Sequence, residues 1–386
     1  MEKYCIIGTG RQGTAALYDL LLFSNASSIL LIDSNQNSIN NCLKLIDKSL
    51  LDKIKIYTEV VDINDKKKLC ELLKTIDVFL SSVPYQYNLM LTEVALLSES
   101  SMVDLGGHTQ NVIQQLQYND EAENKGISIV PDCGMGPGMN VSMALLSMEQ
   151  LDKAEDVYIW DGGLPQSPKP PWNYSLFFNI KGLTNEYDGS ASFLKDGKVV
   201  EVECFEGFEI IDFDEVGKLE AVVTSGGLST MPWTYENKLR TLENKTLRYA
   251  GHWNLMKAYR QLGLFDEKSI SFKNSHFSPR EFYHYLLEPH LTNNDRKDIC
   301  IMRTEAYGLK NNIKSGVRFD VVEKFDNNSN LMAMEKWTGW HASIVMQKIM
   351  DGSIKTGAHP IEKALSGSEF YNEAIKRGYD IKKTIL

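Results

Sequence analysis

Apolar residues in the first third of the chain form short continuous runs, separated by stretches with helical spacing. The runs predict strands near residues 3–8, 28–33, 54–58, 77–83, 101–104 and 127–130. Continuous apolar runs are typical of strands that are buried on both faces of a sheet. The alternation of strands and helices therefore predicts an α/β fold with a Rossmann-type, doubly wound parallel sheet.

The pattern changes after Pro131, where loops rich in glycine and proline separate longer segments of β type. Asp196-Gly197 predicts a hairpin turn in this region. The loops and the longer β segments together indicate a second α+β domain with a mixed sheet. Helical spacing returns at 337–350 and again at 369–377. We therefore expect residues 1–135 and 336–386 to form the dinucleotide-binding domain. Residues 136–335 would form the domain for substrate binding, catalysis and oligomerisation.

The first predicted strand leads directly into a glycine-rich segment that opens a helix. Six residues make up this segment and are candidates for cofactor binding: Gly8, Thr9, Gly10, Arg11, Gln12 and Gly13. In a dinucleotide-binding turn the first glycine allows the tight turn and the second lets the backbone approach a pyrophosphate. The third glycine lets the helix pack closely on the strand, and the helix N-terminus faces the phosphates.

Asp33 closes the second predicted strand, 20 residues beyond Gly13. A carboxylate here accepts hydrogen bonds from a ribose 2′-hydroxyl and repels a 2′-phosphate. Residues 34–37 contain no arginine, so we predict NAD rather than NADP. Asp62, after the third predicted strand, is a further candidate for cofactor binding.

Two more predicted strands end in segments suited to the nicotinamide end of a cofactor, because ligands of open parallel sheets bind beyond the carboxyl ends of the strands. One segment is Ser82-Val83-Pro84, where small residues would leave a ledge for the ring. The other contains Asp104 and Gly106. Each segment has a structural alternative. For the first it is a plain strand-to-loop exit in which Pro84 stiffens the turn, and for the second it is a helix or turn cap by Asp104.

Composition and charge narrow the function classes. The chain has 386 residues, 43% of them apolar and 24% charged, with a net charge of −10. The charge is diffuse and forms no basic stripe, so we expect neither nucleic acid nor a membrane as a partner. No apolar run approaches the ~20 residues of a membrane span. We expect a cytoplasmic protein with reduced cysteines and no metal site, since the six cysteines form no CxxC pair.

The order of several motifs resembles the saccharopine dehydrogenase-like family, most strongly its lysine 6-dehydrogenase branch. The motifs are the glycine turn 8–13, Val83-Pro84, the segments 104–107, 131–138, 162–165 and 247–252, and the tail 357–378. The resemblance covers essentially the whole chain. It implies a nucleotide domain and a substrate domain, an assembly such as a homodimer or homotetramer, and redox chemistry at an amine-bearing carbon of a lysine-derived amino acid.

An amino-acid substrate needs a cation for its carboxylate and an anion for its ammonium group. Arg248, set between Leu247 and Tyr249, is placed for partial desolvation and a bidentate contact, and we assign Arg248 and Tyr249 to substrate binding. Glu186 is the candidate for the ammonium group. The structural alternatives are a buried ion pair for Arg248 and a solvated carboxylate for Glu186.

The reacting amine must lose a proton before hydride leaves its carbon, and the same base can then activate water. Asp104, Asp132 and His252 are the catalytic candidates, and the residues do not decide among them. Cys133 has no neighbouring base in the sequence and is expected to pack rather than react.

Three functions fit this set. The leading hypothesis is NAD-dependent oxidation of the ε-amine of L-lysine to allysine, which cyclises. The second is a saccharopine dehydrogenase or reductase, whose substrate has an additional dicarboxylic arm and needs more cations; the sequence offers Lys238, Arg240, Lys245, Arg260 and Arg303. The third belongs to another class, a catalytically silent protein that senses NAD(H).

Overall fold

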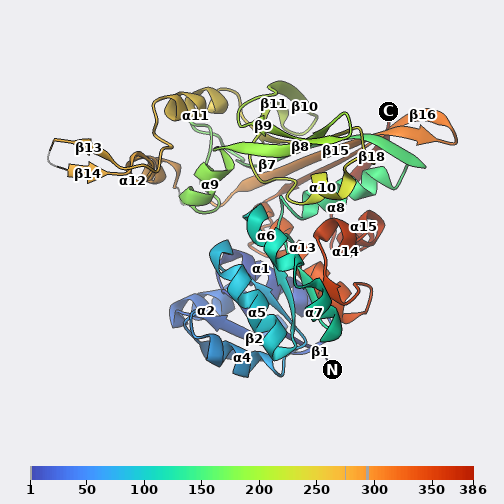
Figure 1. Cartoon of the computed structure of the whole chain (residues 1–386). Helices are drawn as coiled ribbons and strands as arrows, with labels where there is room; N and C mark the ends of the chain where they lie inside the picture. The colour runs from blue at the N-terminus through green and yellow to red at the C-terminus, as the bar shows by residue number, and fades with distance from the viewer. Residues whose placement is uncertain (1, 274, 293–294) are drawn as a thin grey trace.

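The chain folds into two lobes, each built on one large sheet (Figure 1). The computed structural model describes residues 2–273, 275–292 and 295–386. The sheet of the first lobe is entirely parallel and runs in the order β3 (Lys55–Val60), β2 (Ala26–Asp33), β1 (Glu2–Ile7), β4 (Val78–Ser81), β5 (Ser101–Asp104), β6 (Ser128–Val130), β17 (Gly357–Ala358). This order confirms the predicted doubly wound sheet, and β17 adds a seventh strand from the tail.

Both faces of this sheet are covered by helices. Along β1, Tyr4 and Ile6 belong to one apolar core while Cys5 and Ile7 belong to another on the opposite face. This alternation explains why the strand reads as a continuous apolar run. The helices of the lobe are α1 (Arg11–Phe23), α2 (Gln36–Lys44), α3 (Lys48–Leu51), α4 (Lys66–Leu73), the 3₁₀ turn η1 (Tyr85–Tyr87), α5 (Asn88–Ser98), α6 (Thr109–Leu116), α7 (Asn119–Asn124) and α13 (Ala333–Met350).

The sheet of the second lobe is mixed, as predicted. Its central path is β10 (Glu209–Phe213), β11 (Gly217–Val222), β12 (Thr241–Arg248), β7 (Lys153–Pro165), β15 (Asp298–Lys310), β16 (Ile313–Lys324), β18 (Ile381–Ile385). The hairpin of β8 (Ser190–Lys195) and β9 (Lys198–Glu203) joins it at β12. Asp196 and Gly197 form the turn of this hairpin with φ values of 50° and 77°, which confirms the predicted turn.

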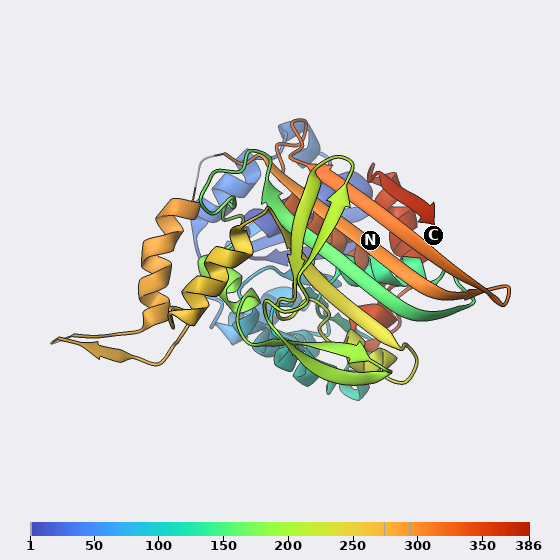
Figure 2. The same ribbon diagram turned by 90° about the horizontal axis from the view of Figure 1, so that it is seen from above.

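Helices of the second lobe surround its sheet unevenly. They are α8 (Met139–Met148), α9 (Ile180–Glu186), α10 (Met231–Tyr235), α11 (His252–Gln261), α12 (Pro279–Leu291), α14 (Ile361–Ala364) and α15 (Gly367–Lys376). Seen from above, α12 and the small hairpin of β13 (Ile270–Phe272) and β14 (Ser275–Phe277) project away from the body of the molecule (Figure 2).

The tail contributes to both lobes. Helix α13 packs on α1, where a Cβ at Gly339 would lie only 2.6 Å from the carbonyl oxygen of Gln12, so the glycine permits the close contact. Strand β17 pairs with β6 in the first sheet, but β18 pairs with β16 in the second. The segment 336–386, predicted to complete the first domain, therefore does so only in part. Its last strand belongs to the second sheet.

Candidate active site

The glycine turn between β1 and α1 has the geometry that a bound pyrophosphate requires. Gly8 has φ of +96°, and a Cβ there would lie 2.7 Å from the carbonyl oxygen of Ser82. A Cβ at Gly13 would overlap the carbonyl oxygen of Gly8, so the third glycine is needed for packing of the helix on the strand. A Cβ at Gly10, by contrast, would meet nothing within 4 Å. The open space at Gly10, next to the N-terminus of α1, is where phosphates fit.

Asp33 is held beside this turn at the end of β2. Its Oδ2 accepts hydrogen bonds from the backbone N and the hydroxyl of Thr9, at 2.8 and 2.9 Å, and its Oδ1 accepts one from the backbone N of Asn35. The carboxylate is thus fixed at the strand end where a ribose hydroxyl is recognised. Asp62 lies beyond β3, exposed, and accepts from the backbone and side chain of Asn64, which lower its pKa.

The remaining residues of the turn also suit a nucleotide. The buried Oε1 of Gln12 has no hydrogen-bond partner among the described residues. Arg11 donates a hydrogen bond of 2.9 Å to the carbonyl oxygen of Phe177, so the turn is tied to the second lobe. Ser82 donates to the carbonyl oxygens of Ile7 and Gly8. These features fit a dinucleotide lying along the edge of the sheet.

The carboxyl ends of β5 and β6 bring Asp104 and Asp132 together. Asp104 is fully buried, and its carboxylate accepts hydrogen bonds from Gly106 N at 2.8 Å, from Asp132 N at 3.2 Å and from Gln115 Nε2 at 2.7 Å. These donors occupy both of its oxygens. Asp104 therefore positions the loop that contains Asp132.

Asp132 is arranged differently. Its Oδ2 accepts a hydrogen bond from the hydroxyl of Ser229 in the second lobe, while its Oδ1 is buried and unpartnered among the described residues. Burial, followed by the negative charge of Asp104, raises the pKa of Asp132 to about 8. Gly106 is the required neighbour, because a Cβ there would overlap this Oδ1. Of these two aspartates, Asp132 is therefore the one whose carboxylate has an oxygen left to accept a proton.

Arg248, near the end of β12, lies in a buried polar cluster of the second lobe. Its NH2 lies 3.2 Å from Oε1 of Glu186, and its Nε donates to the hydroxyl of Tyr187 at 2.8 Å. The guanidinium also stacks on Tyr174, with 4.8 Å between Cζ and the ring centroid. Burial raises the pKa of Glu186, and the charge of Arg248 partly offsets this effect. The structure thus brings together Arg248 and Glu186, which the sequence assigned to opposite ends of an amino acid.

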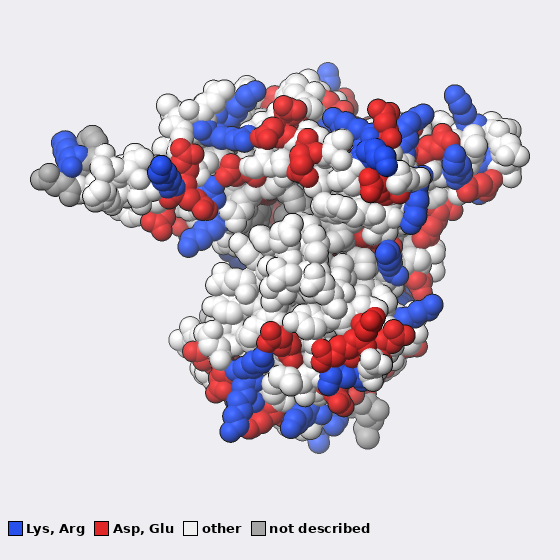
Figure 3. Space-filling view, in the orientation of Figure 1, with Lys and Arg blue, Asp and Glu red and all other residues white. Residues whose placement is uncertain are grey.

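Asp161, on β7, extends this cluster toward Asp132. Its Oδ1 accepts from Nδ2 of Asn244 at 2.6 Å, and burial raises its pKa to about 6. A Cβ at Gly136, four residues after Asp132, would lie 2.9 Å from Oδ2 of Asp161. The loop that follows β6 therefore links the pair Asp104 and Asp132 to Asp161 of the Arg248 cluster. Together these residues form one site between the lobes. Figure 3 shows a recess between the lobes, and the surface around the junction of the lobes is largely uncharged in that view.

His252 is not available as a base. Its Nδ1 lies 2.9 Å from the carbonyl oxygen of Trp172 and its Nε2 lies 3.1 Å from the hydroxyl of Tyr187. Complete burial, together with the charge of Arg248, lowers its pKa to about 3. The catalytic prediction for His252 is corrected accordingly: the neutral ring links the backbone of Trp172 to Tyr187 and so positions Arg248.

Tyr249 lies away from Arg248 because consecutive strand residues face opposite sides of a sheet. Tyr249 packs with Leu247 in the core that contains Trp160, and its hydroxyl donates to the carbonyl oxygen of Pro165 at 2.9 Å. The structure therefore corrects its assignment to substrate binding. Sequence reasoning missed Asp161, Tyr187 and Ser229. In the sequence, only the alternation of side chains along β12 and into Tyr249 indicated that Tyr249 and Arg248 lie on opposite sides of the sheet.

Other chemistry is limited in the described residues. All six cysteines are free, and Cys133 is fully buried with its Sγ 3.4 Å from the carbonyl oxygen of Val130. No group of three or more His, Cys, Asp or Glu side chains in residues 2–273, 275–292 and 295–386 is arranged to hold a metal ion. Nor does any helix in these ranges have the length and apolar character needed to cross a bilayer.

Comparisons with known proteins cover both lobes. A model described as "Saccharopine dehydrogenase NADP binding domain" matches residues 4–130, and one described as "Saccharopine dehydrogenase C-terminal domain" matches residues 134–377. A solved apo saccharopine dehydrogenase (L-Glu forming) from Saccharomyces cerevisiae covers 100% of both chains with a TM-score of 0.78 and 15% identity. That likeness concerns the fold.

Curated relatives are longer than this chain and match it over part of their length. The mitochondrial alpha-aminoadipic semialdehyde synthase of Bos taurus is 23% identical over 282 residues, which are 70% of this chain and 29% of that protein. The saccharopine dehydrogenase [NADP(+), L-glutamate-forming] of Pyricularia oryzae is 22% identical over 223 residues, 55% of this chain and 48% of that protein. The matches thus span less than half of each relative.

Proposed function

Because this chain belongs to the saccharopine dehydrogenase family, we propose that it is a pyridine-nucleotide-dependent oxidoreductase that oxidises the ε-amine of L-lysine. The observation that carries the proposal is the ion pair between buried Arg248 and half-buried Glu186, which lies close enough to Asp161 for both residues to affect its pKa. Such a cluster offers a cation for a carboxylate and carboxylates for an ammonium group, which an amino acid needs at once.

Free lysine suits the cluster better than saccharopine does. The five cations that the sequence offers for a second dicarboxylic arm are each engaged elsewhere: Lys238 with the carbonyl of Thr234, Arg240 with Asp156, Lys245 with Glu209, Arg260 with Glu203 and Arg303 with Asp320. None of them bonds to Arg248 or Glu186 in the described structure. Saccharopine remains the second candidate, because proteins with that name are among the relatives.

In the proposed reaction Asp132 accepts the proton of the ε-ammonium group. The glycine turn 8–13 and Asp33 would hold the dinucleotide, whose nicotinamide would accept the hydride of the ε-carbon. Glu186 and Asp161 attract the ammonium form of the substrate into the site, and Arg248 orients its carboxylate. Water then adds to the iminium carbon left by hydride loss, and Asp132 gives its proton to the nitrogen while it takes one from the added water. The carbinolamine so formed breaks its C–N bond and releases ammonium and the aldehyde. Asp104 and His252 hold these groups in place.

The proposal is tested by following the absorbance of reduced nicotinamide with NAD or NADP and, separately, L-lysine, L-ornithine and saccharopine at alkaline pH. We expect an increase with L-lysine accompanied by release of ammonia. An increase with saccharopine alone would move the assignment to the second candidate. Dinucleotide binding without turnover of any of the three would favour the NAD(H) sensor instead.

We propose NAD as the preferred cofactor although the matching family model is described as NADP-binding. The fixed carboxylate of Asp33 supports this choice, because it would repel a 2′-phosphate. Asp33→Ser should raise the KM for NAD several-fold and raise kcat/KM for NADP by about tenfold, since one repulsive charge is removed. Asp47→Ser is the matched control, because Asp47 caps α3 outside the nucleotide turn. An unchanged ratio of NAD to NADP activity in Asp33→Ser would contradict the assignment.

Arg248→Lys should weaken amino-acid binding while leaving the affinity for NAD unchanged. Lysine keeps the charge but loses the planar fork that contacts Tyr187 and Glu186, so kcat/KM for the amino acid should fall by ~10–100-fold. Arg303→Lys is the control, since Arg303 lies on the same sheet with a side chain 12% exposed but pairs with Asp320. Steady-state kinetics with both substrates varied would measure the difference. Equal losses in the two variants would remove Arg248 from the site.

We also propose that the protein is a homo-oligomer. Tyr285 and Leu286 on the projecting helix α12 are 76% and 50% exposed, and Leu262 near α11 is 76% exposed. Clusters of exposed apolar side chains are typical of protein interfaces. A second copy of the chain is the occupant expected for this surface, and light scattering combined with size-exclusion chromatography should give a mass of at least two chains.

A further inference from the structure

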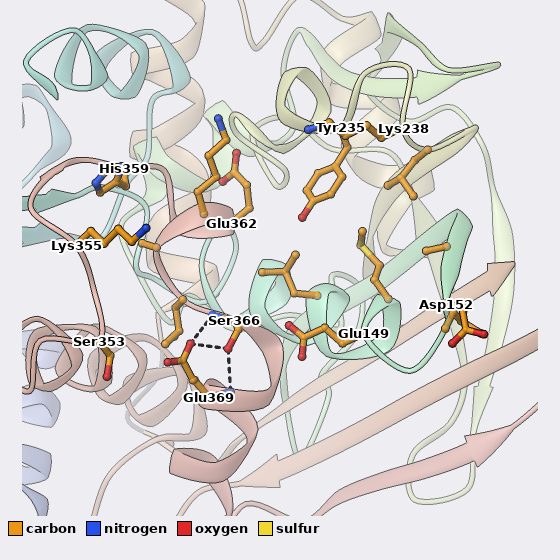
Figure 4. Close-up of a pocket in the computed structure, with 18 residues that line it drawn as sticks. Glu149, Asp152, Tyr235, Lys238, Ser353, Lys355, His359, Glu362, Ser366 and Glu369 are labelled. Atoms are coloured by element: carbon orange, nitrogen blue, oxygen red, sulfur yellow. Dashed lines mark hydrogen bonds between the residues drawn. The ribbon is translucent and has the colours of Figure 1, made fainter. Parts of the chain in front are cut away.

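A second cavity lies outside the recess between the lobes, where residues 353–366 of the tail pack against α8 and α10. It has a volume of about 600 Å³, which lies in the range of small-molecule sites. Figure 4 shows Tyr235 directed into the cavity from α10, with Glu362 on the tail side and Glu149 directly after α8. No step of the proposed reaction uses this cavity.

The lining combines opposite charges with an apolar floor. Glu362 is 6% exposed, and its Oε1 accepts from the hydroxyls of Thr230 and Thr234 at 2.9 and 2.7 Å. Lys355 and Lys363 also line the cavity, and their ammonium groups form no ion pair with any described residue. Apolar side chains complete the wall: Leu145, Met148, Leu239 and Leu365. A ligand with an ammonium group, a carboxylate and an apolar chain would match Glu362, the two lysines and the apolar wall, respectively.

A short path connects this cavity to the proposed proton acceptor. Glu362 accepts a hydrogen bond from Thr230, and Thr230 follows Ser229, whose hydroxyl donates to Asp132. The negative charge of Glu362 also contributes to the raised pKa of Asp132. A ligand that contacts Glu362 would therefore act on Asp132 through the backbone of Ser229 and Thr230, directly before α10, and through its charge.

We propose that this cavity is an effector site for a small zwitterionic amino acid whose ammonium group binds Glu362 and whose carboxylate binds Lys355. The expected effect of the ligand on turnover rests on the proposed function, whereas binding of the ligand to this cavity does not. An ammonium group at Glu362 offsets its negative charge, so Asp132 loses its proton at lower pH. The other titratable groups of the lining are Tyr235 at the end of α10, Lys238 after it, Glu149 directly after α8, Asp152 before β7, Glu369 from α15, and His359 and Lys363 from the tail. Asp132 itself also faces Asp104 and Cys133.

Isothermal titration calorimetry with L-norleucine tests binding, because this amino acid has no ε-amine to be oxidised. We expect a Kd of about 1 mM or tighter. Glu362→Gln should weaken binding by about tenfold, since the charge is lost while the acceptor for the threonines is kept. Hexanoate and n-pentylamine, which each lack one charged end, should bind more weakly. Lys355→Ala should reproduce the loss if Glu362→Gln is unstable.

Arg248→Lys separates this cavity from the substrate site and should leave norleucine binding intact. Loss of binding in Arg248→Lys with full binding in Glu362→Gln would overturn the proposal, as would the absence of heat at about 10 mM norleucine. The kinetic arm measures the pH dependence of kcat, whose midpoint should move to lower pH when norleucine is added to the wild type but not to Glu362→Gln. Binding without this shift would refute the coupling to Asp132. A protein without turnover would still give a decisive calorimetric result.

Discussion

Replacing Asp132 with Asn is expected to lower kcat by ~10²–10⁴-fold, the range that general acid–base catalysis typically contributes. The carboxyl group is buried beside Asp104, and its pKa is raised to about 8. Below that pH it is protonated and cannot accept the proton of the substrate amine. The kcat of the wild type should therefore rise as the pH passes through about 8, and this limb should be absent in Asp132→Asn.

Ser229→Ala tests the same prediction, because it changes the pKa of Asp132 while keeping its carboxyl group. The hydroxyl of Ser229 donates to Oδ2 of Asp132 and so favours the charged form. Its removal should raise the pKa of Asp132 and move the limb to higher pH, with kcat recovered in more alkaline buffer. Steady-state rates at saturating amino acid and cofactor would measure both effects. A limb that persists unchanged in Asp132→Asn would assign the titration to another group.

Arg377→Met is expected to lower the free energy of unfolding by about 3–5 kcal/mol, the cost of leaving one partner of a buried pair without the other. Arg377 binds Asp19 through Nε at 2.6 Å and NH2 at 3.0 Å, and both side chains are 0% exposed. Ser343 and Gln347 of α13 also donate to Asp19. The pair thus joins the end of α15 to α1 and α13, and urea unfolding followed by circular dichroism would measure the loss.

Two further variants make this stability prediction specific. Lys376→Met removes an exposed pair with Glu373 and should cost about 0–1 kcal/mol. The double variant Asp19→Leu with Arg377→Met should recover much of the stability, because an apolar pair leaves no unpaired charge in the core. A cost for Arg377→Met no larger than that for Lys376→Met would show that the buried pair does not hold the tail in place.

The local pattern was sufficient for the nucleotide turn and its sheet. Although Gly8 also packs against Ser82 at the end of another strand, the spacing of Gly8, Gly10 and Gly13 after an apolar run identified the turn. The same holds for the hairpin at Asp196 and Gly197, because both require positive φ. The signal for each of these features lies within a few residues, so it could be recognised without knowledge of distant contacts.

The candidate site was foreseen only in part because its members come from distant elements. Arg248 and Glu186 stood out by residue type, and their pairing followed from the packing of α9 against β12. Nothing near Asp161 or Ser229 in the sequence indicated that either would lie beside the strand ends. His252 carried the expected chemistry for a base, and only its contacts with Trp172 and Tyr187 removed that role.

The sequence by itself determined the alternation of strands and helices in the first lobe, the parallel character of its sheet and the cofactor turn, because periodicity and glycine spacing act through neighbours along the chain. Tertiary structure decided which side chains are buried, charged and within contact distance. It separated Tyr249 from Arg248, divided the tail between the two sheets and made Asp132 the acidic residue with an unpartnered oxygen. Burial and Coulomb interactions set a pKa through groups that meet only when the lobes pack together, so the chemistry of the site is a property of the fold.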